Sequence, residues 1–210
     1  MSVVRRRAEQ RVEEVNPWVA RAPSEPANQP DSREPRDAVA PLPAPLPGVT
    51  APAPQRRLAS RTLSLQELLV PGFIVSAHGG AGASTLAALS PGWQAAGQAW
   101  PVSPDPGRPV RVLLSARTSY TGLRAAQAAL IDWTSGRVPV QLEGLALLAC
   151  APGRLPKQLR PLLELVRGGL PGRVWEIGWQ PQWQLGEPAM PADRDLKDLF
   201  AALRNPPKEE

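Results

Sequence analysis

The chain has 210 residues and a formal net charge of +5, from 24 Lys and Arg against 19 Asp and Glu, and 42% of its residues are hydrophobic. This length fits one medium domain with a tail, and the single Cys and single His exclude an internal disulfide and a zinc site built from Cys and His clusters. No apolar run reaches the ~18 residues of a membrane span, and the N-terminus lacks the apolar region of a signal peptide, so we expect a cytoplasmic protein without a membrane span. The chain also lacks a run of five like charges, so specific nucleic-acid binding is not expected.

Residues 1–60 are predicted to form a disordered, Pro-rich N-terminal arm. Eleven of the 27 prolines lie between residues 15 and 60, where they remove backbone donors and prevent a sheet or a long helix. The composition of residues 2–15 is compatible with a short helix. Trp18 has no core of its own in such an arm, and either docks on the folded domain or serves as a linear motif for a protein partner.

The folded domain is expected to cover residues 61–210. Ser64 and Glu67 have the spacing of a capping box, which predicts a short helix through Val70 that ends at Pro71. After it come, in chain order, a strand at Phe73–Ala77, a helix from Ala83 or Ser84 to about Leu89, a strand at Val110–Ala116, a helix around Leu123–Trp133 closed by Gly136, a strand within Leu142–Cys150, a helix at Pro156–Arg167, a strand at Val174–Trp179, and a final helix at Asp193–Leu203 capped by Asp193. This alternation predicts an α/β domain with a small parallel sheet covered by helices on both faces.

A glycine-rich loop separates the first buried strand from its helix. It reads His78-Gly-Gly-Ala-Gly-Ala-Ser-Thr85, and a strand, a glycine turn and a helix opening on Ser-Thr together form a construction that holds phosphate. Arg117 and Arg154 follow the next two strands and are expected at the same edge of the sheet, where a guanidinium can grip phosphate. The candidate binding residues are therefore Gly79, Gly80, Ala81, Gly82, Ala83, Ser84, Thr85, Arg117 and Arg154, with the Ser84 hydroxyl as a candidate ligand of Mg²⁺. The alternative is a tight turn kept for packing, with both arginines solvated and His78 an ordinary loop residue.

The loop resembles the deviant Walker A motif of the ParA/MinD family of P-loop ATPases, which reads Lys-Gly-Gly-x-Gly-Lys-[Ser/Thr]-[Ser/Thr]. The glycines at 79, 80 and 82 match the motif, as do Ser84 and Thr85, whereas the two lysines of the family fall on His78 and Ala83. The form found here is most similar to lysine-less relatives linked to septum-site and pilus-positioning proteins, and to small uncharacterised actinobacterial proteins of mobile elements. The resemblance implies a P-loop NTPase-like fold, ATP or ADP with Mg²⁺ as ligand, and a possible homodimer.

Two departures from this family argue against hydrolysis. An alanine at position 83 cannot neutralise phosphate charge, and no strand ends in an acid that would hold Mg²⁺. The acids between residues 73 and 150 are Asp105, Asp132 and Glu143, which are predicted in a loop, on a helix and at the start of a strand. The segment 90–109, where the family carries its switch strands, looks compressed.

The expected function is therefore nucleotide or phosphate binding without efficient hydrolysis, in a regulatory or positioning partner of plasmid or mobile-element maintenance, conjugation, or a cell-pole or septum apparatus. The rival is an interaction adaptor that recruits a protein partner through its arm. A third possibility is an ATPase that takes its missing groups from another subunit. Cys150 is expected to be a small buried residue, and Trp175, Ile177 and Trp179 to face either the core or a partner.

Overall fold

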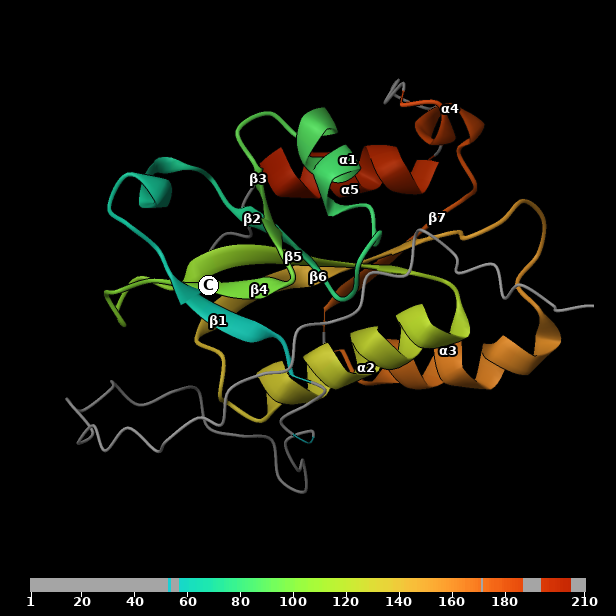
Figure 1. Ribbon diagram of the computed structural model, residues 1–210, viewed down its shortest axis with the longest axis horizontal. Coiled ribbons are helices and arrows are strands. Elements are labelled where there is room, and N and C mark those ends of the chain that lie inside the picture. Colours follow the sequence, from blue (N-terminus) through green and yellow to red (C-terminus); the bar gives the residue numbers. More distant parts are fainter. Residues whose placement is uncertain (1–52, 54–56, 171, 187–193, 205–210) are drawn as a thin grey trace, which may run out of the picture. The chain divides into compact units, whose positions relative to one another are not determined.

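The computed structural model describes residues 53, 57–170, 172–186 and 194–204. The short helix and Trp18 expected in the arm lie outside these residues, as does the expected cap Asp193. The described part is an α/β fold, in which a parallel sheet lies between helices (Figure 1). The class predicted from the alternation of strands and helices is confirmed.

The main sheet has five parallel strands, which lie in the spatial order β3 (Gln94–Gly97), β2 (Phe73–Ser76), β5 (Val110–Arg117), β6 (Val140–Leu148) and β7 (Arg173–Ile177). The chain moves from β2 outward to β3, and then returns to place β5 on the other side of β2. This reversal makes the gap between the carboxyl ends of β2 and β5 a topological switch point, the place where open α/β sheets bind ligands. The two loops that meet there are the glycine loop and the turn after β5.

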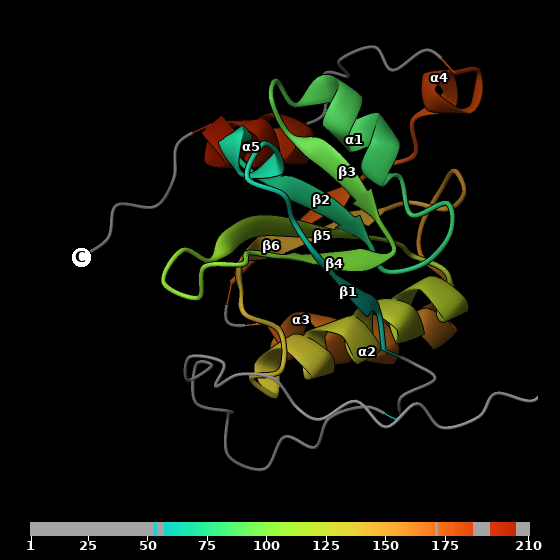
Figure 2. The same cartoon turned by 60° about the vertical axis from the view of Figure 1, so that its left-hand side comes forward.

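Helices cover both faces of the sheet, as predicted. Figures 1 and 2 show α1 (Ala83–Leu89) and α5 (Arg194–Arg204) on one face, and α2 (Tyr120–Thr134) and α3 (Arg160–Gly168) on the other. Because side chains alternate along a strand, Ile74 packs with the first helix pair and Val75 with the second. Among the helices in the described residues, none has the length and apolar character that crossing a lipid bilayer requires.

The segment 90–109, which looked compressed, holds two strands. One is β3, and the other is β4 (Ala99–Val102), which pairs in parallel with β1 (Ala59–Thr62) in a separate two-stranded sheet. Neither has a strong sequence signal, because β3 is an edge strand of small, mostly exposed residues and β4 contains Pro101. The expected start of the domain at residue 61 falls inside β1.

The capping box at Ser64 and Glu67 is confirmed, although the helix is only the single 3₁₀ turn η2 (Glu67–Leu69). The Ser64 backbone N–H and hydroxyl both donate to Glu67 Oε2 at 2.9 Å, and Arg61 Nη1 lies 2.6 Å from Oε1. The backbone donor first, and then the Arg61 guanidinium and Ser64 hydroxyl, lower the pKa of Glu67 to about 2.

A buried carboxylate, Asp132 on α2, is 4% exposed beneath the two-stranded sheet. Arg57 Nε and Arg137 Nε each lie 3.8 Å from its Oδ1, and the fully buried Trp100 indole N–H faces it without a hydrogen bond of good geometry. Burial raises the pKa of Asp132, and the two guanidinium groups and Trp100 only partly oppose that effect. A charge here costs desolvation energy that its distant partners do not fully return.

We predict that the difference in the free energy of unfolding between the wild type and Asp132→Asn depends on pH, because a charge at Asp132 is costly. The native pKa lies above the ordinary value of 3.8, so the native state holds more protons than the unfolded chain between these two values. The free energy of unfolding of the wild type should therefore rise, relative to the Asn variant, as the pH falls from 7 toward 4. Urea unfolding at several pH values measures this difference, and a gap that stays constant or shrinks would contradict the assignment.

We predict that residues 57–60 stabilise the fold, although the Pro-rich composition of the arm places them before the expected start of the domain at residue 61. A chain that starts at Arg57 should unfold at the temperature of the full chain. A chain that starts at Arg61 loses the Arg57–Asp132 contact, the packing of Leu58 and half of β1, and should be less stable by about 2 kcal/mol, or roughly 4–8 °C in melting temperature. Thermal unfolding of the two shortened chains beside the full chain provides the comparison. Equal stability of both short chains would show that β1 is dispensable.

Candidate binding site at the carboxyl edge of the sheet

The glycine loop leaves β2 at the switch point and enters α1 through Gly82. Gly82 is the N-cap of α1 with φ +91°, and Gly80 also has a positive φ, +75°. A side chain at Gly82 would be strained in this conformation, and its Cβ would lie 2.5 Å from Leu148 Cδ2. The glycine at 82 is therefore required by the backbone and by the close packing of β6, whereas Gly80 has open space around it.

Arg117, the last residue of β5, connects the glycine loop to the neighbouring strand. Its Nε donates to the Gly80 carbonyl at 3.1 Å, and its Nη1 donates to the Ala149 carbonyl, after β6, at 2.9 Å. The prediction that Arg117 and the loop share one edge of the sheet is confirmed. A purely solvated Arg117 is ruled out, because the guanidinium spans two loops that are far apart in sequence.

His78 supports the same junction. Its Nε2 accepts the backbone N–H of Arg117 at 3.0 Å, so the ring proton is assigned to Nδ1, which lies 2.8 Å from the Gly79 carbonyl and donates to it. Both ring nitrogens are therefore engaged in holding the loop against β5. This geometry gives His78 a positioning role.

Two residues that the sequence reasoning missed begin α2 at this junction. Ser119 caps the helix, its Oγ accepting the Gly122 backbone N–H at 3.1 Å. A Cβ at Gly122 would lie 2.2 Å from the Arg117 carbonyl oxygen and 2.9 Å from His78 Nε2. Gly122 lets α2 approach the Arg117–His78 contact, and a glycine in the first turn of an otherwise regular helix was the available signal for this close approach.

The other candidate residues differ in access. Ser84 is exposed at the start of α1 and Thr85 is half-buried, whereas Ala81 and Ala83 are buried. Ala83 is 3% exposed and belongs to the apolar cluster under α1, so its side chain points toward the core.

Arg154 is exposed in the loop after β6, at the same edge of the sheet as the glycine loop. It lines a cavity of about 360 Å³ together with Thr118 and Cys150, and the backbone N–H of Cys150 donates to Thr118 Oγ1. The glycine loop does not line this cavity.

Cys150 is exposed, contrary to the prediction of a buried thiol, because β6 ends two residues earlier, at Leu148. Trp175 and Ile177 are buried core residues under α1 and α5.

The residues of the loop do not fit Mg²⁺. The three acids considered above lie elsewhere: Asp132 on α2, Glu143 paired with Arg111 near the amino ends of β5 and β6, and Asp105 in the turn that leads into β5. The Ser84 hydroxyl is thus left without a carboxylate to share a cation, and the described residues contain no group of three or more acidic, His or Cys side chains arranged to hold a metal ion. The donors that remain suit an anion.

Comparison of the chain with protein-family models, with curated proteins and with solved structures returns no match.

We predict that Arg117 is needed to hold the site together. Arg117→Met removes two charge-assisted hydrogen bonds to backbone carbonyls and should lower the free energy of unfolding by about 1–3 kcal/mol. The free energy of unfolding of Arg117→Lys should lie between those of the wild type and Arg117→Met, since one ammonium group cannot make both bonds of a guanidinium. Arg154→Met is the matched control, because Arg154 is exposed and should change stability by less than about 0.5 kcal/mol. Equal losses of stability in the two methionine variants, measured by urea unfolding, would contradict a stabilising role of the Arg117 hydrogen bonds.

Proposed function

We propose that the chain binds the phosphate part of a nucleotide, or of a similar phosphorylated molecule, at the switch point, and does not hydrolyse it. The observation that carries this proposal is the 3.1 Å contact between Arg117 Nε and the Gly80 carbonyl. It holds a permanent positive charge against a glycine loop at the edge where open parallel sheets take their ligands.

Enough donors remain free to receive a phosphate. A guanidinium has five N–H groups, and Arg117 uses two of them on the loop carbonyls, which leaves three. The first intrahelical bond of α1 runs from the Leu86 N–H to the Gly82 carbonyl, so the N–H groups of the preceding residues have no helical partner. The exposed Ser84 hydroxyl adds one further donor beside them.

Two further groups at the same edge of the sheet offer contacts for the rest of a nucleotide. Tyr120 is 62% exposed at the first residue of α2 and presents a flat aromatic face on which a base can stack. Arg154 and its cavity provide a second cationic position at the same edge. These residues support a ligand larger than inorganic phosphate.

The absence of turnover follows from the chemistry of phosphoryl transfer. That reaction relies on a lysine and a metal ion that together neutralise the charge developing on the phosphate. Here Ala83 is buried in place of the lysine, and the loop has no carboxylate to help hold the metal. The groups present bind charge but do not activate water.

A chain that binds without turnover fits the role of a regulatory or positioning protein with a protein partner. Leu65 and Leu69 support a partner surface, because they are 78% and 83% exposed on and beside the single turn η2. The cellular process that the ParA/MinD resemblance implies, in mobile-element maintenance or in positioning at the pole or septum, is part of this proposal.

The test is titration calorimetry with ADP and with pyrophosphate, in excess EDTA and again in Mg²⁺. We expect one site that does not require Mg²⁺, and stabilisation of about 2.7 kcal/mol at 100 times the dissociation constant. Ser84→Asp should reduce the affinity at least about tenfold, because its carboxylate repels the phosphate, yet it should keep stability, since an acid is favourable at a helix N-terminus. Ser84→Asn is the matched neutral control and should bind like the wild type.

Absence of binding at millimolar ADP and pyrophosphate would favour the adaptor. Equal binding by the Asp and Asn variants would move the ligand away from the glycine loop. Steady ATP hydrolysis that Ser84→Asp abolishes would overturn the non-hydrolytic assignment and indicate that another subunit completes the site.

A further inference from the structure

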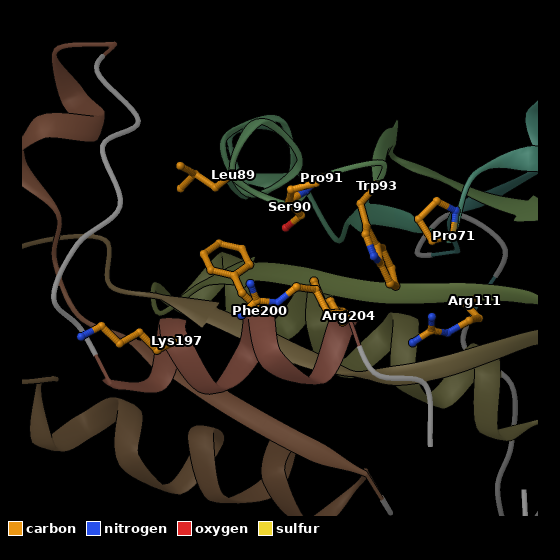
Figure 3. Close-up of a pocket in the computed structure, with 10 residues that line it drawn as sticks. Pro71, Leu89, Ser90, Pro91, Trp93, Arg111, Lys197, Phe200 and Arg204 are labelled. Carbon is orange, nitrogen blue, oxygen red and sulfur yellow. The ribbon is translucent and has the colours of Figure 1, made fainter. Parts of the chain in front are cut away.

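A second candidate site lies at the opposite edge of the sheet from the glycine loop. A cavity of 610 Å³ opens at the amino ends of β2 and β5, between α5 and the turn that follows α1 (Figure 3). Its volume is in the range of small-molecule sites, roughly 300–1,000 Å³. The lining residues are mostly apolar, with Trp93 and Phe200 as the aromatic members, both nearly buried, and its charged members are Arg111, Lys197 and Arg204.

Arg111 is the polar group inside this cavity. Its Nε donates to Glu143 Oε1 at 2.7 Å, its guanidinium carbon lies 5.3 Å from the centre of the Trp93 ring, and its side chain is 17% exposed. Figure 3 shows the guanidinium reaching from β5 toward Trp93 and Arg204. The Nη2 atom of Arg111 is buried and has no hydrogen-bond acceptor among the described residues. Because this atom is closed off from solvent, the part of Arg111 that lines the cavity acts on a ligand through the positive charge of the guanidinium.

The rim of the cavity adds positive charge. Lys197 and Arg204 lie about two helical turns apart on α5 and are both exposed. In Figure 3, Arg204 extends along the helix toward Phe200. Within the described residues, no carboxylate lies at ion-pair distance from either side chain. Because Glu143 balances only Arg111, the lining carries an excess of positive charge over an apolar floor.

We propose that this cavity binds a small organic anion with a flat apolar body, of the class of aromatic carboxylates and sulfonates. The body would lie between Trp93 and Phe200, and its anionic group would face the positive charge of Arg111, Lys197 and Arg204. Since the apolar floor excludes water, a singly charged carboxylate or sulfonate, which costs less to dehydrate than a phosphate monoester, suits this place better. This ligand site does not depend on the glycine loop or on the function proposed for it.

The experiment compares two fluorescent probes on the full chain. Anilinonaphthalene sulfonate and N-phenylnaphthylamine share an aromatic body, but only the first carries an anionic group. We expect one site per chain, and at least about tenfold tighter binding of the sulfonate. Arg204→Glu should reduce that preference, whereas Arg194→Glu, with the same change of charge on the same helix and a side chain 93% exposed outside the lining, should leave it unchanged. The variant with Arg111→Met and Glu143→Gln together should bring the two affinities close to each other.

Equal affinities of the two probes in the wild type would overturn the proposal, as would equal effects of Arg204→Glu and Arg194→Glu. Because these two substitutions are at the surface, they decide the question even if the Arg111 and Glu143 variant does not fold. A wild type that binds neither probe and sediments as a dimer would also overturn it, since a second copy of the chain would then fill the cavity. Ser84→Asp, which is designed to weaken phosphate binding at the other edge, should bind both probes like the wild type.

Discussion

The hydrogen bonds of Arg117 are the constraint on which the carboxyl edge of the sheet depends. One guanidinium joins the Gly80 and Ala149 carbonyls, and the backbone N–H of the same residue is held by His78. The loops after three adjacent strands are therefore fixed by one residue at the end of the middle strand. Gly122 completes the arrangement, because only a residue without a Cβ lets α2 begin so close to this contact. A loop rich in glycine loses much entropy on folding, and these bonds offset part of that cost.

The strand β5 has an arginine near each end, and the two arginines organise the two candidate sites in a similar way. Arg117 contacts the glycine loop after β2 on one side and the carbonyl that follows β6 on the other. Arg111 contacts Trp93, just before β3, on one side and Glu143 of β6 on the other. In each case a central strand supplies a cation that bridges its neighbours, and the sheet that positions one group also positions the other. The middle of β5, where the residues are buried and apolar, separates them.

The sequence was sufficient to predict those elements in which local pattern and burial agree. Strands β2 and β5 are continuous apolar runs, as buried parallel strands require, and α2 has its apolar residues on one face. The strands β3 and β4 escaped prediction because pairing, not composition, makes them strands. The edge location of Arg117 followed from topology, but its bonds and the ring contacts of His78 depend on distances between loops that no spacing in the sequence encodes. The cavity at the amino edge had no local signal, since its lining comes from four separate segments.

The two arginines differ in hydration, and under the two proposals this difference would lead them to select different anions. Arg117 is half-exposed, and its bonds go to neutral carbonyls, so no carboxylate among its hydrogen-bond partners in the described residues offsets its charge. The phosphate that we propose as the ligand there is strongly hydrated and would keep part of its water shell. Arg111 lies against an aromatic ring and is already paired with a carboxylate, so this pair contributes little net charge and the excess positive charge of the cavity comes from Lys197 and Arg204. An anion there must give up its water, and the apolar floor compensates only a ligand that brings apolar surface with it. If both proposals hold, the same residue type at two ends of one strand would serve two kinds of ligand because its surroundings differ.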